Sequence, residues 1–468
     1  MSTFGGILSI ARGAISAHQT AIQVVSHNVA NAETPGYTRQ RAMLQENWPA
    51  RLPQGILGTG VFVSDVTQIR DTLLDISYRR DTSNASNFGL RRDLLGQVEQ
   101  IFHEPSESGL GATMDAFWNA WSDLSNAPDN NVARQVVQQR GAQVADALRG
   151  HVAQLDQVKA DTIARLDRSV AQMNQFAGQV ADLNRQIVVS ESGGQTAGDL
   201  RDARNRIIDS MSRLASIQVI EQPSGGVAVI VANQTLVDGD SANALTYGDM
   251  GDPLTTQVSF RGSEEPIRGI GGELQAATDM LNQDLTQTRA RLDDLARGII
   301  SAVNTIHEGG WSPTEAVTDP PPSDWEGSGI AFFTGTDAAS IALSSEVAGD
   351  PRAIAAGDVY GGVASNSIAL KLSQLRDTPV TVGGTTSSLA GHYRDTVTTL
   401  AMRTADAASS TAAHETLAAQ SEIRRQSVSG VSTDEELVQL MRSQQAYVAA
   451  TRLISAVDEM AQALLNMV

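Results

Sequence analysis

The chain has 468 residues, a formal net charge of −19 at pH 7, no cysteine and few aromatic residues. Its length predicts three or four domains with buried cores, its negative charge argues against nucleic acid and anionic membranes as partners, and its lack of cysteine excludes disulfides and thiolate chemistry. No stretch has the roughly 18 apolar residues of a membrane span, and we expect no cleaved secretory signal, because the N-terminus has neither a basic flank nor a cleavage site.

An amphipathic helix is predicted at the N-terminus. Its apolar positions alternate in steps of four and three residues, which is the spacing of a coiled-coil seam that packs on a partner helix. These positions are Phe4, Leu8, Ala11, Ile15, His18, Ile22, Val25 and Val29. Pro35 lacks a backbone donor and disfavours helix at Thr34, so the helix is expected to stop before a turn at Gly36.

A polar motif marks the end of this helix. It includes Asn28, Asn31, Pro35, Gly36, Tyr37, Arg39 and Gln40. The run Ser-His-Asn-Val-Ala-Asn-Ala-Glu-Thr-Pro-Gly-Tyr, residues 26–37, resembles the N-terminal signature of flagellar axial proteins, the class of rod, hook and hook-associated proteins. Its continuation, Thr38-Arg39-Gln40, is similar to the hook-associated protein 1 family within that class.

Helical patterns dominate the next part of the chain, after an extended segment with a short helix near 71–80. We predict helices over 84–102, around 114–124, over 132–190 and over 199–214. Gly141, Gly150 and Gly178 are candidate breaks in the longest of these. Phe117, Trp118 and Trp121 lie at helical spacing, which is typical of core residues rather than of a ligand platform.

The pattern changes to strict alternation at residue 216, which predicts a small β-rich insertion. Two alternating runs, 217–219 and 227–231, flank a Pro-Ser-Gly-Gly turn and predict a hairpin. A helix returns over 272–307, and a surface loop without periodicity follows over 311–329. Short strands and a helix near 365–375 are predicted in the remainder, up to residue 390.

The C-terminal part is predicted to be helical over 392–427 and again from Thr433 to the end. Thr433 and Glu436 have the spacing of a capping box. The last helix has a second coiled-coil seam, in which one set of positions is seven residues apart and another follows three residues later. The two sets are Leu440, Tyr447, Ile454, Ala461 and Val468, and Ser443, Ala450, Val457 and Leu464.

No catalytic or metal-binding constellation stands out in the sequence. No two histidines lie three to five residues apart, so a helical zinc pair is missing. Asp293 with Asp294 could be read as the carboxylate pair of a glycosidase, but on a helix such neighbours usually form a solvated face. A surface hydrolase acting on peptidoglycan is therefore the weaker alternative, and we expect no catalytic residue, no cofactor and no metal.

The residues alone predict a mainly α-helical, elongated fold with long terminal helices, a helical bundle in the middle and an inserted β domain. Antiparallel pairing of the terminal seams would bring the chain ends together and project the middle outward. Apolar surface left on such a narrow pair would attract neighbouring copies, and head-to-tail contacts of this kind build tubes. We therefore hypothesise a structural protein that assembles with itself.

The resemblance to the hook-associated protein 1 family extends over nearly the whole chain. It is carried by residues 271–274, 303–307, 332–333 and 350–356 in the middle and by 429–436, 444–447 and 458–465 at the end. It implies a terminal-helix inner-tube domain (1–35 with 432–468), a helical middle domain (36–215 with 272–310 and 391–431) and a β-rich outer domain (216–271 with 311–390). The seam residues would then be subunit-interface residues.

The resemblance also implies a function and partners. It implies an extracellular junction that joins the flagellar hook to the filament after export through the flagellar type III apparatus. The implied partners are the hook protein, hook-associated protein 3, further copies of the chain and an export chaperone, which we place on the seam of 433–468. Another axial protein on the same scaffold is the alternative. We expect the terminal helices to be poorly ordered in the free monomer, because each lacks its assembly partner there.

Overall fold

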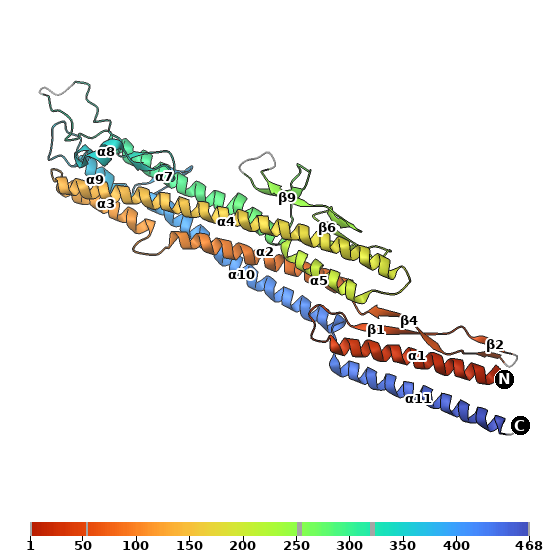
Figure 1. Ribbon diagram of the computed structural model, residues 1–468. Coiled ribbons are helices and arrows are strands. Elements are labelled where there is room, and N and C mark those ends of the chain that lie inside the picture. Colours follow the sequence, from red (N-terminus) through yellow and green to blue (C-terminus); the bar gives the residue numbers. More distant parts are fainter. Residues whose placement is uncertain (1, 53–54, 250–254, 319–322, 467–468) are drawn as a thin grey trace.

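The computed structural model describes residues 2–52, 55–249, 255–318 and 323–466, and the molecule is a long rod (Figure 1). Both chain termini lie at the same end of the rod. Most of the described residues are helical, and the strands form only small antiparallel sheets, so the prediction of a mainly α-helical fold with inserted β structure is confirmed. In the part of the chain that is described, no helix is both long and apolar enough to cross a membrane.

The helices account for the length of the rod. They are α1 (Ser2–Ala30), α2 (Thr72–Phe102), α3 (Leu110–Asn126), α4 (Asn131–Glu191), α5 (Gly198–Leu214), α6 (Gly272–Asp279), the π-helical turn η1 (Met280–Asp284), α7 (Leu285–His307), α8 (Ser345–Gly349), the 3₁₀ turn η2 (Pro351–Ala353), α9 (Ser367–Gln374), α10 (Leu389–Ser429) and α11 (Thr433–Leu465).

The strands are short and pair locally. They are β1 (Gln40–Glu46), β2 (Ala50–Leu52), β3 (Gly55–Leu57), β4 (Val61–Gln68), β5 (Ile217–Glu221), β6 (Val227–Val231), β7 (Gln234–Asp238), β8 (Ser241–Ala242), β9 (Leu245–Gly248), β10 (Gln257–Phe260), β11 (Phe333–Thr334), β12 (Ala342–Leu343), β13 (Val380–Val382) and β14 (Thr385–Ser387). The largest sheet has four strands in the order β5-β6-β7-β8, and the predicted hairpin over 217–231 is confirmed.

Two helices are longer than the sequence pattern predicted. α2 begins at Thr72 behind Asp71, whose carboxylate accepts hydrogen bonds from the N–H groups of Leu73 and Leu74 at 2.8 and 3.4 Å. It then continues without interruption through both segments that were predicted as separate helices. α4 is one helix of 61 residues, so the prediction of breaks at its glycines is wrong.

The continuity of α4 has a physical reason. A glycine inside a helix costs about 1 kcal/mol relative to alanine, whereas burying a Leu or Val side chain contributes about 1.5–3 kcal/mol. α4 buries a stripe of such side chains along its whole length, and this outweighs three glycines. Gly141 also allows a close approach, because a Cβ atom there would lie 2.7 Å from Cε1 of Phe332 and 3.1 Å from Cδ2 of Leu343.

The helical body is held by one continuous apolar core to which α2–α7, α9 and α10 contribute. Its aromatic part lies toward the end of the rod away from the termini, where Phe117, Trp118 and Trp121 are fully buried, so their interpretation as core residues is confirmed. Trp121 packs on Phe332 with 5.4 Å between ring centroids. Asn304 fixes the strand start beside them, because its Oδ1 accepts from the N–H groups of Phe332 and Phe333 at 3.0 and 2.9 Å.

The β structure that follows α5 in the chain lies on the helical body at two separate places. Residues 217–260 lie beside the C-terminal half of α4, where Asn184 donates to the carbonyls of Val227 and Gly239 at 2.8 and 2.7 Å. Residues 330–388, with α8 and α9, lie near the end opposite the termini (Figure 1). No strand of the described chain pairs between these two segments, although the sequence led us to expect them in one outer domain.

Candidate assembly site

The two terminal helices form an antiparallel pair at one end of the rod (Figure 1). α11 packs chiefly against α1. Its most buried apolar and small side chains are Ser443, Ala450 and Val457, which are spaced by seven residues as in a coiled coil. Leu440, Tyr447 and Ile454 lie on the same side and are half-buried. The side chain of Leu464 is not among those described, and Val468 lies outside the described residues.

α1 has two packing stripes rather than the one expected from the sequence. On the expected stripe, Val25 is buried and Ile15 and Ile22 are half-buried, while Leu8 and Val29 remain 40% and 37% exposed. The side chain of Phe4 is not described.

The second stripe of α1 consists of small side chains at the same four-and-three spacing. Ala17, Ala21, Val24 and Asn28 are all buried. Toward its N-terminal end, this side of the helix meets β4, where a Cβ on Gly13 would lie 3.0 Å from the carbonyl oxygen of Val61. The signal for this stripe was the run of alanines, which a search for large apolar side chains overlooks.

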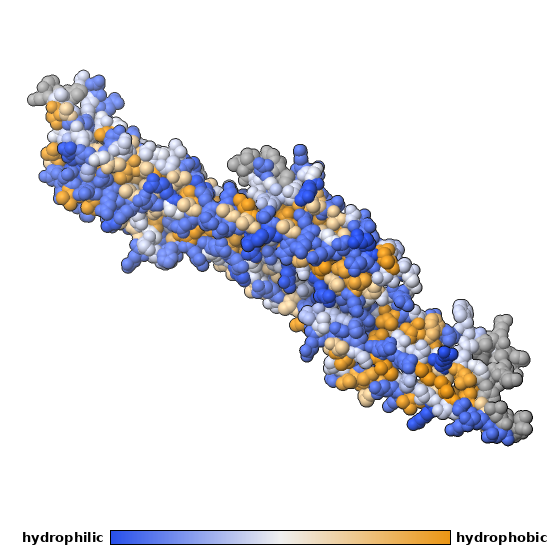
Figure 2. Space-filling model, viewed as in Figure 1, coloured by the Kyte–Doolittle hydropathy of each residue, from blue (hydrophilic) through white to orange (hydrophobic). Residues whose placement is uncertain are grey.

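The terminal pair and the adjacent β1–β4 ribbon leave apolar side chains exposed (Figure 2). On α11 the exposed apolar side chains are Leu437, Val438, Met441, Val448, Leu453 and Met460, and on the ribbon and its loop they are Met43, Leu44, Trp48 and Phe62. Trp48 is 94% exposed. A groove of about 970 Å³ also lies between α1, β1 and α11. One chain alone therefore does not close this region.

The motif at the end of α1 joins the terminal pair to the ribbon. Asn28 is buried and uses its whole hydrogen-bonding capacity. Its Nδ2 donates to the carbonyl of Gln40 at 2.8 Å and to Oε2 of Glu436 at 2.9 Å. Its Oδ1 accepts from the N–H of Gln40 at 3.0 Å and from the hydroxyl of Tyr37 at 2.8 Å. Only an amide side chain of this length offers two donors and two acceptors here.

The turn after α1 depends on the next residues of the motif. Asn31 Nδ2 donates to the carbonyl of His27 at 3.0 Å and so satisfies one of the free carbonyls at the helix end. Gly36 has φ +72°, and a Cβ there would lie 2.6 Å from Cγ of Arg206 on α5. The helix therefore stops where Pro35 predicted, and Gly36 lets the chain pass close to the helical body.

Arg39 connects three parts of the molecule. Its Nε and Nη1 donate to Glu436 and Glu435 at 2.7 and 2.8 Å, and its backbone N–H donates to the carbonyl of Ser429 at 2.9 Å. Glu436 was predicted to close a capping box at the start of the last helix. Its carboxylate instead accepts from Arg39 and Asn28, because α1 lies close enough to supply charged and amide donors.

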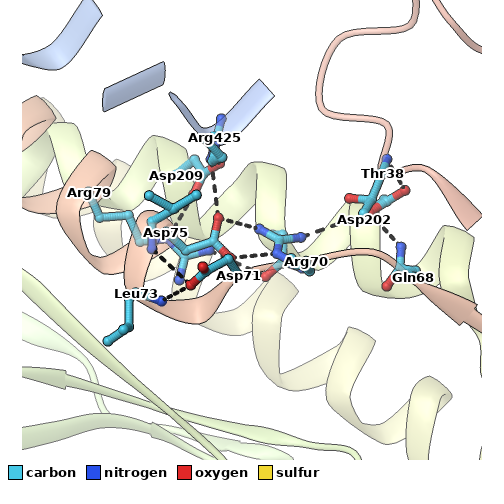
Figure 3. A network of polar contacts seen from close by, with 12 residues as sticks. Thr38, Gln68, Arg70, Asp71, Leu73, Asp75, Arg79, Asp202, Asp209 and Arg425 are labelled. Atoms are coloured by element: carbon cyan, nitrogen blue, oxygen red, sulfur yellow. Dashed lines mark hydrogen bonds and ion pairs between the residues drawn. The ribbon is translucent and has the colours of Figure 1, made fainter. Parts of the chain in front are cut away.

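A network of ion pairs continues from the motif into the helical body (Figure 3). Asp202 of α5 accepts from the backbone N–H of Thr38 at 2.9 Å and from Nε2 of Gln68 at 2.7 Å. Arg70 pairs with Asp75 at 2.6 Å and lies 3.9 Å from Asp202. The motif, the ribbon and the first turn of α2 thus converge on one face of α5.

Asp209, about two turns further along α5, pairs with two arginines. Arg79 of α2 and Arg425 of α10 lie 2.7 and 2.6 Å from its carboxylate oxygens. Burial alone would raise the pKa of Asp209, but the two guanidinium charges outweigh it and lower that pKa. For Asp202 burial prevails and raises the pKa, although the hydrogen bonds from Thr38 oppose it. These pairs could not be predicted from residue spacing, because their members lie more than a hundred residues apart.

The motif residues of the sequence analysis thus meet in one place, at the joint between the terminal pair and the helical body. The side chains at this joint form hydrogen bonds and ion pairs with other parts of the same chain. The described residues there are not arranged as a catalytic site. Within the described residues no group of three or more His, Asp or Glu side chains is placed to hold a metal ion.

Comparison with known proteins gives the class of the molecule. Residues 8–38 match the model of the flagella basal body rod protein, and residues 425–467 match that of the flagellar basal body rod FlgEFG protein C-terminal region. These matches cover α1 from Leu8 onward with its motif up to Thr38, and the whole of α11. The terminal pair is therefore that of a flagellar axial protein.

The middle of the chain narrows the class to one family. Residues 95–318 match the helical domain of flagellar hook-associated protein FlgK. Flagellar hook-associated protein 1 of Bacillus subtilis is 29% identical over 99% of this chain and 98% of its own length, and that of Escherichia coli is 24% identical over 98% and 99%. The similarity of the chain to the flagellar hook-associated protein 1 family therefore extends over nearly its whole length.

A solved structure has the same fold. The flagellar hook junction protein FlgK from Burkholderia pseudomallei superimposes with a TM-score of 0.63 and 16% identity, over 76% of this chain and 100% of that one. These similarities indicate a structural component of the bacterial flagellum that associates with other axial proteins, rather than an enzyme.

Proposed function

We propose that this chain is the adaptor that joins the hook to the filament, and that it assembles with further copies of itself into a tubular layer. The observation that carries the proposal is the unfinished terminal pair. Its two helices cover one seam against each other and expose Leu8, Val29, Met441 and Leu453 on their remaining surface. Exposed apolar side chains gathered at one end of a rod favour contacts with neighbouring chains.

The seam residues divide into two groups in this proposal. Ile15, Ile22, Val25, Leu440, Tyr447, Ile454 and Val457 form the contact between the two helices of one chain. Leu8 and Val29, with the outer face of α11, contact neighbouring copies, and Phe4 and Leu464 extend the two helices toward the chain ends. Residues 1–35 with 432–468 would then form the inner tube.

The proposal also assigns the remaining parts of the rod to layers outside the inner tube. Residues 36–215, 272–310 and 391–431 form the helical middle domain of the proposal. The two β-containing segments, 216–271 and 311–390, are two surface modules rather than one outer layer, because they lie at separate places on the helical body.

The partners of the proposal are the hook protein on one side and hook-associated protein 3 on the other. An export chaperone covers residues 433–468 before assembly, because an apolar helix face without its neighbours needs cover. Export proceeds through the flagellar type III apparatus, and the lack of cysteine suits a chain that travels unfolded without disulfides.

Deletion of the gene tests the adaptor function. We expect hooks without filaments and flagellin released into the medium, counted by electron microscopy and measured by blotting the culture supernatant. Normal filaments in the deletion strain would overturn the proposal.

A point variant tests the assembly surface. Leu453 on α11 and Leu370 on α9 are 46% and 45% exposed, so a charge introduced at either changes the monomer to a similar degree. We expect a Leu453→Glu chain to be exported but to leave hooks bare, whereas Leu370→Glu supports filaments. Equal filament numbers with both variants would argue against α11 as the assembly surface.

A further inference from the structure

Four arginines line a cleft of about 270 Å³ between the β1–β4 ribbon, α2, α5 and the first strands of the four-stranded sheet. Three of them already have a carboxylate partner. Arg70 pairs with Asp75 at 2.6 Å, Arg79 pairs with Asp209 at 2.7 Å, and Arg201 pairs with Glu191 at 2.7 Å.

The fourth arginine, Arg204 of α5, has no such partner. Its side chain is among the largest fully buried ones, with 1% exposure, and no carboxylate of the described chain lies within ion-pair distance of it. Its Nη1 donates to Oδ1 of Asn184 at 3.0 Å and to the carbonyl of Gly225 at 2.9 Å. Its Nε is buried without any hydrogen-bond partner.

An uncompensated buried cation is unusual in a chain with a net charge of −19. Burial and the charge of Arg201, with a smaller contribution from Arg70, lower the pKa of Arg204 to about 10, although the charges of Glu221 and Glu191 oppose this shift. At neutral pH the guanidinium is still charged. A buried charge without a counter-charge costs several kcal/mol, and an anion beside it removes that cost.

We propose that this cleft binds a small tetrahedral oxyanion, phosphate or sulfate, with Arg204 as its principal contact. A cavity of this volume holds such an anion with several waters, since a water occupies about 30 Å³. Guanidinium groups present paired N–H donors that match the oxygens of a phosphate. A bound anion connects Arg204 on α5 with the elements that carry Arg70 and Arg79, and so fixes the ribbon on the helical body.

The carboxylate of Glu221 allows a second test of anion binding, in which the expected effect has the opposite sign. It lines the same cleft, it is exposed, and it has no ion-pair partner among the described residues. A negative charge there opposes an incoming anion, so removing it should strengthen binding. Glu221→Gln and Arg204→Met therefore act in opposite directions if the cleft is an anion site.

The experiment uses the full chain in chloride buffers of constant ionic strength, to which phosphate is added and binding is measured by calorimetry and thermal unfolding. Arg213, an exposed residue of the same helix, supplies the matched control. We expect phosphate to raise the melting temperature of the wild type and of Arg213→Met. We expect at least tenfold weaker binding in Arg204→Met and tighter binding in Glu221→Gln.

Two outcomes would overturn the proposal. One is that phosphate binds Arg204→Met as tightly as the wild type and raises both melting temperatures equally, or that it changes neither. The other is binding to Glu221→Gln that is no tighter than to the wild type, and this measurement decides the matter even if Arg204→Met fails to fold. Sulfate should raise the melting temperature as phosphate does. Tighter binding of acetate than of phosphate would show that the cleft prefers a carboxylate, and the proposal of a tetrahedral anion would then be wrong.

Discussion

The helical body and the terminal pair are both built from long helices, but they bury very different side chains. In the body, Trp121, Leu148 and Leu166 are completely buried within one continuous core. In the terminal pair the buried apolar side chains are alanines and valines, as at Ala17, Ala450 and Val457, while leucines and methionines such as Leu453 and Met441 stay on the surface. None of the described residues of α1 and α11 belongs to the core of the body.

The difference in buried side chains indicates which region is stable without neighbouring chains. Stabilisation by burial scales with apolar area, about 25 cal/mol per Å², so alanine and serine seams contribute far less than leucine and tryptophan. The terminal pair buries little apolar area, and the groove between α1, β1 and α11 leaves further space unfilled beside its seam. The body covers its apolar core with its own chain, whereas the terminal pair leaves exposed apolar side chains that other chains cover in our proposal.

Amide hydrogen exchange on the free monomer should give the largest contrast. Amides in the middle of α4, such as Leu148, open only with global unfolding, whereas those of α1 and α11 open locally. We expect Ile15 and Ile454 to exchange at least a hundredfold faster than Leu148, as measured by mass spectrometry or NMR. Equal protection in both regions would break the comparison and refute poor order in the unassembled terminal helices.

Core truncations should separate the two regions in stability. We expect Trp121→Ala to lower the free energy of unfolding by about 3–5 kcal/mol, because it removes a large side chain from a closed core. Val457→Ala, on the seam of α11, should leave the main unfolding transition unchanged, because the terminal pair is not part of that core. Urea titration followed by circular dichroism measures both, and a shifted main transition in Val457→Ala would show that the regions unfold together.

The same contrast explains how much of the fold could be predicted from the sequence. The periodic patterns gave the existence and limits of α1 and α11 and the hairpin of residues 217–231, because side-chain spacing reports the face that an element buries. They failed where burial overrides local propensity, as at the glycines of α4. Whether segments 216–271 and 311–390 form one domain could not be derived from the patterns, since periodicity contains no information about position along a rod.

The joint was predictable in its residues but not in its contacts. Asn28, Pro35, Gly36 and Arg39 stood out as a motif, and turn chemistry explained where α1 ends. Their partners could not be found from spacing, because Glu436 is 408 residues from Asn28. For the same reason the carboxylates that surround the motif on α5 had no sequence signal, and Arg204 gave none at all.

A buried histidine in the body should make stability depend on pH. His307 is fully buried, its Nδ1 lies 2.6 Å from the carbonyl of Ile330, and its Nε2 accepts from the N–H of Ala355 at 3.0 Å. Burial lowers its pKa to about 4, because the charged imidazolium would lose its hydration, although the carbonyl of Ile330 opposes this shift. The unfolded chain, with a pKa near 6.5, therefore binds the proton first as the pH falls.

The sign and size of this effect follow from that order of protonation. Stability should be full above about pH 6.5 and should fall by about 3 kcal/mol as the pH drops to 4. Urea unfolding between pH 4 and 7 measures it, with His307→Gln losing most of the histidine contribution and the exposed His103→Asn keeping it. Identical profiles for wild type and His307→Gln would assign the pH dependence to other groups, such as Asp209, whose lowered pKa also reduces stability in acid.

The joint should give the smallest effect on stability, although it sets the position of the terminal pair. Asn28→Asp replaces the two Nδ2 donors by a second carboxylate beside Glu436, and the loss of a buried hydrogen bond costs about 1–3 kcal/mol. The expected result is unchanged helix content with a broader distribution of distances between α11 and α5. Because the chain has no cysteine, one introduced cysteine on each helix allows spin-label distance measurements without removing native thiols. The control is Asn126→Asp, at an exposed helix end far from the joint, which should leave the distance distribution narrow. An equally narrow distance distribution in Asn28→Asp would mean that Arg39 and the ribbon hold the terminal pair without this amide.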